Sequence, residues 1–156
     1  MSDKKLETTI RDAVKLHGHL GPFLVIGVRM GTVAKRILAS SGNKDSLSRV
    51  MVKVPLRTPY SCILDGIQIT TKCTIGNQRL KVEDSPEEIT AEFQAQDANN
   101  TLILSTNPRI IGEIENAFSR GTTNEELAER IASAAEEQLF ELKRRWIPLR
   151  TVLSST

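Results

Sequence analysis

Two short stretches of the chain hold side chains that could bind a metal ion. The H-G-H sequence carries both histidines, His17 and His19, and residues 60–77 carry both cysteines, Cys62 and Cys73. An H-x-H pair in a turn can direct two imidazoles toward one ion, and two nitrogens with two sulfurs suit tetrahedral zinc. The spacing is not that of a zinc finger. Two alternatives stay open: histidines that interact with a helix dipole, and cysteines that serve as small apolar core residues.

A helix beginning near Cys62 would turn three polar side chains to one side. On a helical pattern Cys62, Asp65 and Gln68 share a face, opposite a face of isoleucine and leucine. Asp65 and Gln68 could orient an imidazole or bind a polar ligand, or they could belong to an ordinary solvated helix face. Asn77 could also contact a ligand, although the Gly-Asn pair that contains it is a common turn sequence.

Size and composition place the chain in a broad class. Its 156 residues, 39% hydrophobic and 26% charged, fit one globular domain. A net charge of +2 and scarce aromatic residues argue against a nucleic-acid surface, and the longest apolar run, residues 23–28, is too short to span a bilayer. The chain begins without an apolar leader, and its cysteine spacing fits neither a C-x-x-C motif nor a disulfide framework. We therefore expect a cytoplasmic protein with reduced thiols that binds neither nucleic acid nor membranes.

The elements that must position these residues follow from periodicity and turn signals. Strands are predicted at residues 50–56, 79–83, 89–96 and 101–105, with a turn at 73–77. Helices are predicted at residues 3–16, 22–40, from Cys62, after the Asn107-Pro108 cap, and from the Thr123/Glu126 capping box to about Arg145. This order predicts a single α+β domain with a mixed, mostly antiparallel sheet and helices packed on it.

The second predicted helix has two further features. Gly27 and Gly31 are spaced for close packing against another helix. Val25 and Val28 lie on the polar side of its apolar stripe, so that the first half of the helix would be covered on both faces. We take this two-sided apolar character as a reason to expect a homodimer.

Taken together, H-G-H-L-G-P and the later C-x-x-D-G-I-Q-x-x-T-x-C-T-x-G-N resemble the signature of the FmdE family, which is named after a component of formylmethanofuran dehydrogenase. The resemblance covers about residues 10–110, and predicted helices over 108–146 would complete one FmdE-like domain over residues 1–156. It implies an α+β core, often dimeric, with a His/Cys-lined groove for a transition metal. The following residues map onto motif positions: His17, His19, Cys62, Asp65, Gln68, Cys73, Thr74 and Asn77.

The chain departs from that family pattern at three positions. Gly21 stands where the motif has a cysteine, and Phe23 stands where it has a glycine. Lys72 replaces the glycine that usually precedes the second cysteine. A thiolate ligand or nucleophile at position 21 is therefore lost, which weakens the expectation of redox chemistry but leaves metal binding through the other positions.

Two hypotheses about function result. In the first, the protein binds a divalent transition metal, with zinc as the leading expectation, through His17, His19, Cys62 and Cys73, and acts in or beside one-carbon or redox metabolism related to methanogenesis. Gln68, Thr74 and Asn77 would then line a groove for a small-molecule ligand, and Asp65 would be the nearest candidate catalytic base. In the second, the protein is a non-enzymatic accessory or ligand-binding subunit, for example of a larger dehydrogenase complex. Whether the protein is an enzyme stays open.

Overall fold

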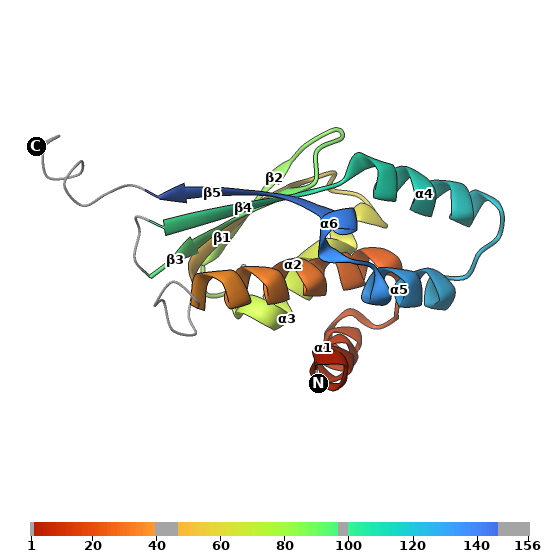
Figure 1. The fold of residues 1–156 in the computed structure, drawn as a ribbon, viewed down its shortest axis with the longest axis horizontal. Coiled ribbons are helices and arrows are strands. Elements are labelled where there is room, and N and C mark those ends of the chain that lie inside the picture. The colour runs from red at the N-terminus through yellow and green to blue at the C-terminus, as the bar shows by residue number, and fades with distance from the viewer. Residues whose placement is uncertain (1, 40–46, 97–99, 147–156) are drawn as a thin grey trace, which may run out of the picture.

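The computed structural model of the protein describes residues 2–39, 47–96 and 100–146. The elements follow in the order α1 (Ser2–His17), α2 (Pro22–Ala39), β1 (Leu47–Val54), the short 3₁₀ helix η1 (Tyr60–Cys62), α3 (Ile63–Thr71), β2 (Leu80–Asp84), β3 (Thr90–Ala95), β4 (Asn100–Thr106), α4 (Pro108–Ser119), α5 (Asn124–Ser133), α6 (Glu136–Leu139) and β5 (Phe140–Trp146). The predicted fold class is confirmed: the five strands form one mixed, mostly antiparallel sheet and the domain is α+β (Figure 1).

The sheet has the strand order β2-β1-β3-β4-β5, and only β1 and β2 run parallel. Alternate residues of β1, such as Val50 and Val52, are fully buried and face the helices. Their partners on β3, Ala91 and Phe93, are buried on the same face. The other face carries mainly polar and charged side chains, as is common in sheets that pack helices on one side. The core therefore lies between this sheet and the helical layer.

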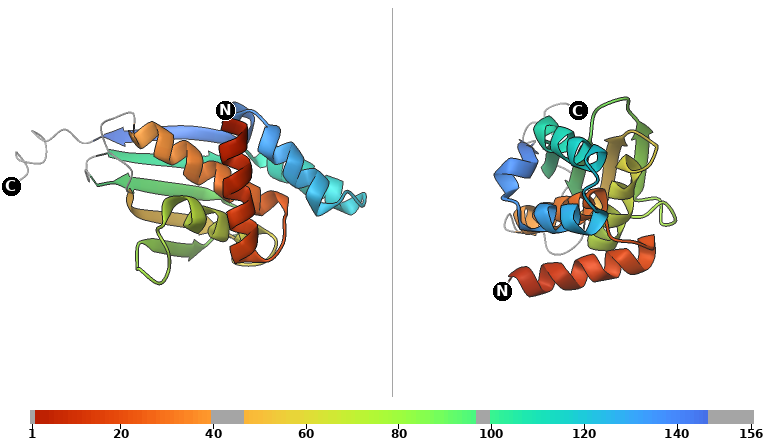
Figure 2. Two further views of the ribbon diagram at one scale, coloured as in Figure 1. Left: turned by 90° about the horizontal axis from the view of Figure 1, so that it is seen from below. Right: turned by 90° about the vertical axis from the view of Figure 1, so that its right-hand side faces the viewer.

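The helical layer is built around α2. Figure 1 shows α2, α3 and α5 along one face of the sheet, and Figure 2 shows α1 crossing α2 and α3 on the side away from the sheet. Val25 packs in the main core, while Val28 packs against Ala13 of α1. Both faces of the first half of α2 are thus covered from within the chain. The two-sided apolar pattern has an intramolecular explanation, and a homodimer stays a prediction that rests on the family resemblance.

The prediction of a last helix reaching to about Arg145, and with it the expectation of helices throughout residues 108–146, is wrong. Helix α5 ends at Ser133, α6 is a single short turn, and residues 140–146 form strand β5. β5 pairs with β4 along its length, which places Phe140 against Thr106 and buries it. The Glu, Leu, Lys and Arg residues of this segment favour helix, but pairing with an open sheet edge outweighs that local preference.

Two glycines allow α2 and α3 to pack backbone against backbone. A Cβ atom at Gly27 would lie 2.1 Å from the carbonyl oxygen of Ile63, and a Cβ at Gly66 would lie 2.4 Å from the carbonyl oxygen of Leu24. The close packing predicted for Gly27 and Gly31 is confirmed, since a Cβ at Gly31 would overlap Thr70. This contact sets the start of α3 beside the start of α2.

Arg29 of α2 holds the end of α5. Its Nη1 donates hydrogen bonds of 2.9, 3.0 and 2.9 Å to the carbonyl oxygens of Ile131, Ala132 and Ala134. Burial lowers the pKa of the guanidinium, and the carbonyls at the helix C-terminus offset the loss of water. Arg29 therefore fixes α5 over α2.

We expect Arg29→Met to lower the free energy of unfolding by about 2 kcal/mol, because it removes hydrogen bonds from a charged donor and leaves helix-end carbonyls without a partner. Arg29→Lys keeps a charged donor and should lose clearly less. Urea unfolding of both variants measures the difference. Equal losses in the two would show that the hydrogen bonds contribute little beyond the packing of the side chain.

None of the helices in the described ranges is long and apolar enough to cross a membrane.

Candidate metal site

The H-G-H sequence forms the turn between α1 and α2. α1 ends at His17, and Gly18 takes the left-handed backbone conformation, with φ of 104°, that favours glycine. Its N–H donates to the carbonyl oxygen of Val14 at 2.7 Å, which closes the helix. The turn brings the rings of His17 and His19 together, with centroids 4.6 Å apart.

Cys62 completes a cluster with the two histidines. It ends η1 at the start of α3 and is 7% exposed. One ligand atom from each of His17, His19 and Cys62 lies within 4.8 Å of the other two. Four-coordinate zinc with bonds of about 2.0–2.3 Å holds its ligand atoms about 3–4 Å apart, so small side-chain rotations would suffice. Three of the four predicted ligands are therefore brought together.

Cys73, the fourth predicted ligand, is not part of this cluster. Its Sγ lies 3.7 Å from the carbonyl oxygen of Leu47, and the side chain is 1% exposed within the main core. Burial raises the pKa of its thiol. The structure thus gives Cys73 the environment of a small apolar core residue, the alternative that the sequence left open.

A chain of hydrogen bonds links the cluster to the turn after α3. Nδ1 of His17 is 2.7 Å from Oδ2 of Asp65, and Nε2 of Gln68 donates to Oδ1 of the same carboxylate at 3.2 Å. Oε1 of Gln68 in turn accepts from the backbone N–H of Ile75 at 3.2 Å. Both oxygens of Asp65 therefore have protein partners, an arrangement that suits orienting His17. The role of Asp65 as a catalytic base stays a prediction.

Thr74 and Asn77 use their polar atoms within the turn itself. Oδ1 of Asn77 accepts from the backbone N–H of Thr74 at 2.9 Å, and Oγ1 of Thr74 accepts from that of Asn77 at 3.0 Å. Nδ2 of Asn77 also donates to the carbonyl oxygen of Lys72 at 2.7 Å. Lys72 has a φ of 62°, which explains why glycine suits this position. The contacts of Thr74 and Asn77 are those of turn residues, and they reach the cluster only through Gln68.

The donor atoms of the cluster fit a metal. Nδ1 of His17 is held by Asp65, whereas its Nε2 is buried and has no hydrogen-bond partner. A buried nitrogen without a partner is unfavourable unless something else satisfies it. A carboxylate on one nitrogen and a metal on the other is a recurrent arrangement for histidine ligands.

The thiol of Cys62 adds a condition. Burial, and after it the charge of Asp65, raises the pKa of this thiol. A metal is bound by the thiolate, so binding at neutral pH would release a proton.

Gly21, the position of the missing motif cysteine, faces the cluster. A Cβ there would lie 3.6 Å from Nε2 of His19 and 3.1 Å from Oδ1 of Asn124. Asn124 is the first residue of α5, directly after its cap Thr123. Sequence reasoning missed Asn124 because the only local signal, the Thr123 capping box, predicts a helix start and says nothing about which turn it faces.

Comparisons with known proteins agree with this fold and with these motifs. The family FmdE, Molybdenum formylmethanofuran dehydrogenase operon, matches residues 16–146. An FmdE-like protein of tungsten formylmethanofuran dehydrogenase from Syntrophus aciditrophicus superposes with a TM-score of 0.57 over 93% of this chain and 74% of its own, at 19% identity, which supports the fold.

A curated relative from Archaeoglobus fulgidus, named probable S-adenosyl-L-methionine-binding protein, is 34% identical over 77 residues. That match covers 49% of this chain and 20% of the relative, so this chain spans about a fifth of the relative's length. Since the family match covers most of the chain, including both motif stretches, the chain belongs to the FmdE family.

Proposed function

We propose that the protein binds one divalent transition metal, zinc in the first place, through His17, His19 and Cys62. The observation that carries this proposal is the buried Nε2 of His17, which has no hydrogen-bond partner while a carboxylate orients its ring from the other nitrogen. Two imidazole nitrogens and one thiolate are ligands that zinc prefers over harder cations.

Three protein ligands would leave one position for another molecule, as in catalytic zinc sites. The metal, when bound, supplies a Lewis acid for a carbonyl or a water molecule. Asp65 would hold His17 in one ring orientation, and Gln68 would hold Asp65. Gly21 and Asn124 would border the remaining position, with the carboxamide of Asn124 as a polar contact for a small ligand. By family membership we place this activity in or beside one-carbon or redox metabolism.

A second candidate is favoured by Gly21. If the cysteine of the motif is needed for chemistry, a chain with glycine there would keep the metal as a structural or ligand-binding centre. Such a protein would act as an accessory component, with other chains of a formylmethanofuran-type dehydrogenase complex as its partners. The metal site is common to both candidates and is therefore the part to test first.

The metal content of protein purified without an affinity tag tests the proposal. Plasma mass spectrometry should find about one transition-metal ion per chain, and almost none in the His19→Ala/Cys62→Ala double variant. A native protein that contains no metal and takes up none on titration would refute the metal site. The fold could then be tested as a plain ligand-binding or partner-binding domain.

Asp65→Asn separates an orienting role from a purely structural one. It keeps the size of the side chain but removes the charge that faces Nδ1 of His17, and we expect it to weaken zinc binding by about 10- to 100-fold. Competition with a chromophoric chelator measures the change in Kd. Asp12→Asn, which removes an exposed carboxylate from α1, is the matched control and should leave the Kd unchanged. An unchanged Kd in Asp65→Asn would remove Asp65 from the site.

A further inference from the structure

A second site-like feature lies on the other side of the sheet from α1. It is a cleft of about 790 Å³, which is in the range of small-molecule sites. Its walls come from the segment after β1, the loop between β2 and β3, the ends of β3 and β4, and α4. None of His17, His19 and Cys62 lines it.

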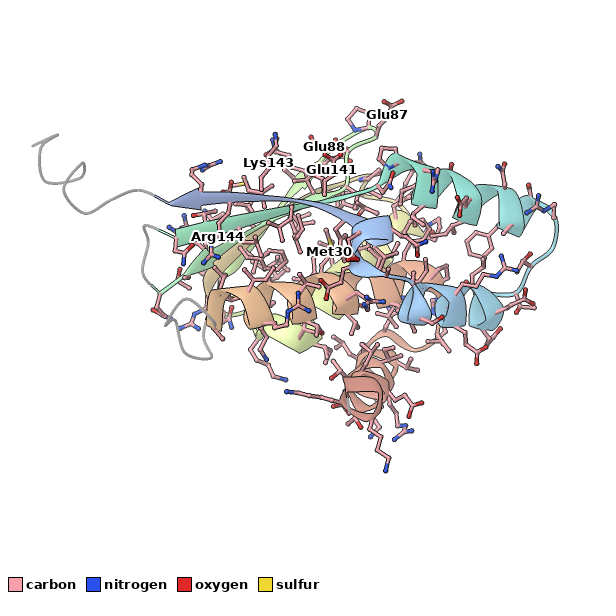
Figure 3. The ribbon with its side chains drawn as sticks, in the orientation of Figure 1. Met30, Glu87, Glu88, Glu141, Lys143 and Arg144 are labelled. Atoms are coloured by element: carbon pink, nitrogen blue, oxygen red, sulfur yellow. The ribbon has the colours of Figure 1, made fainter. Side chains whose placement is uncertain are left out.

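The cleft is acidic in a chain that is slightly basic overall. Its charged lining consists of four glutamates and one arginine: Glu87, Glu88, Glu115, Glu141 and Arg57. The lining thus carries a net charge of −3, against +2 for the whole chain. Figure 3 shows Glu87, Glu88 and Glu141 on the side of the sheet opposite α2. A cleft lined by one sign of charge concentrates ligands of the other sign.

Two of the four carboxylates already have partners, and two do not. Glu115 accepts a hydrogen bond from the hydroxyl of Tyr60, and Glu88 accepts one from Thr90. Within the described residues, no hydrogen bond or ion pair engages Glu87 or Glu141. Both are exposed, so they are free to pair with a cation that enters the cleft.

Thr106 provides an observation that is independent of the charges. It lines the cleft and is 6% exposed, yet its Oγ1 has no hydrogen-bond partner. Its backbone N–H is already used, since it donates to the carbonyl oxygen of Ile89 at 2.9 Å. The hydroxyl is therefore a buried polar group at the cleft wall that a ligand with N–H donors would satisfy.

The lining favours an extended organic cation over a metal ion. The glutamates form no group of carboxylates close enough to share an ion; among the described residues only His17, His19 and Cys62 do so. Apolar side chains separate the charges, among them Ile89, Ile111 and Pro108. The ring of Tyr60 already holds a cation, because the guanidinium of Arg57 lies 4.7 Å from its centroid.

We propose that this cleft binds an aliphatic polyamine. Its ammonium groups pair with Glu87 and Glu141 and donate to Thr106, and its methylene segments lie against the isoleucines and prolines. Such a molecule spreads its charges over the distances that separate the carboxylates. This site is separate from the metal site and does not depend on it.

Calorimetric titration of the full chain with spermidine tests the proposal, with fully acetylated, uncharged spermidine as the matched probe. We expect spermidine to bind and the acetylated form not to bind, and the Glu87→Gln/Glu141→Gln double variant to bind about tenfold more weakly. Thr106→Val should also weaken binding. Replacing the exposed glutamates should leave the melting temperature nearly unchanged, which guards against a folding defect.

Metal-site variants provide the second control. His19→Ala should bind spermidine as the native protein does, because His19 lies outside the cleft. The absence of binding by native protein at millimolar spermidine, equal binding of the acetylated form, or equal affinity in the double glutamine variant would each overturn the proposal.

Discussion

Addition of zinc should raise the melting temperature of the metal-free protein by about 8–16 °C when free zinc is about 1,000 times its Kd. A ligand that binds only the folded state adds about 4.1 kcal/mol at that concentration, and a chain of this size gains about 2–4 °C per kcal/mol. His19→Ala and Cys62→Ala should each lose most of this shift, because each removes one of three ligands whose donor atoms lie within 4.8 Å. Scanning calorimetry with and without zinc measures it.

Cys73→Ala is the matched control for Cys62→Ala. Both cysteines are buried, and burial raises the pKa of both thiols, so the two substitutions remove similar side chains from similar surroundings. Cys73→Ala should lower the melting temperature of the metal-free protein but keep the zinc-induced shift. A shift lost in Cys73→Ala and kept in Cys62→Ala would contradict the arrangement described here.

Gly66→Ala should lower the free energy of unfolding by about 3 kcal/mol or more. The added methyl would meet the backbone of α2, 2.4 Å from the carbonyl oxygen of Leu24 and 2.6 Å from the backbone nitrogen of Val28. Backbone atoms inside a helix cannot rotate away as a side chain can, so α3 would have to move off α2. Because α3 and the turn before it carry Asp65 and Cys62 to the histidines, the same variant should also bind zinc more weakly.

Gly112→Ala is the control, because nothing lies within 4 Å of the added Cβ in α4. Replacing this helix glycine by alanine should stabilise the protein by about 0.5–1 kcal/mol. Urea unfolding of the two variants therefore should give opposite signs. If Gly66→Ala is as stable as the native protein, the close contact between α2 and α3 is not maintained in solution.

Local patterns predicted most of the fold. The strands β1 to β4 show alternation or β-branched residues, and the H-G-H and Asn107-Pro108 signals mark helix boundaries that depend on only a few neighbouring residues. Strand β5 could not be found in this way. Its residues favour helix, and its conformation comes from pairing with β4, a distant segment of the chain.

The candidate site shows the same division. The types and spacing of His17, His19 and Cys62 pointed to one ligand set, and the structure brings these three together. The same reasoning included Cys73, because a sequence does not say which of two cysteines on one stretch faces the core. Asn124 and the acidic cleft depend on contacts between distant segments, so nothing local marks them.

The X-ray absorption spectrum at the zinc edge tests the central claim most directly, on protein loaded with one equivalent of zinc. The arrangement of His17, His19 and Cys62 predicts one sulfur ligand and the multiple-scattering pattern of two imidazoles, with the sulfur signal lost in Cys62→Ala and kept in Cys73→Ala. A spectrum with two sulfur ligands, or with oxygen ligands and no imidazole, would contradict it.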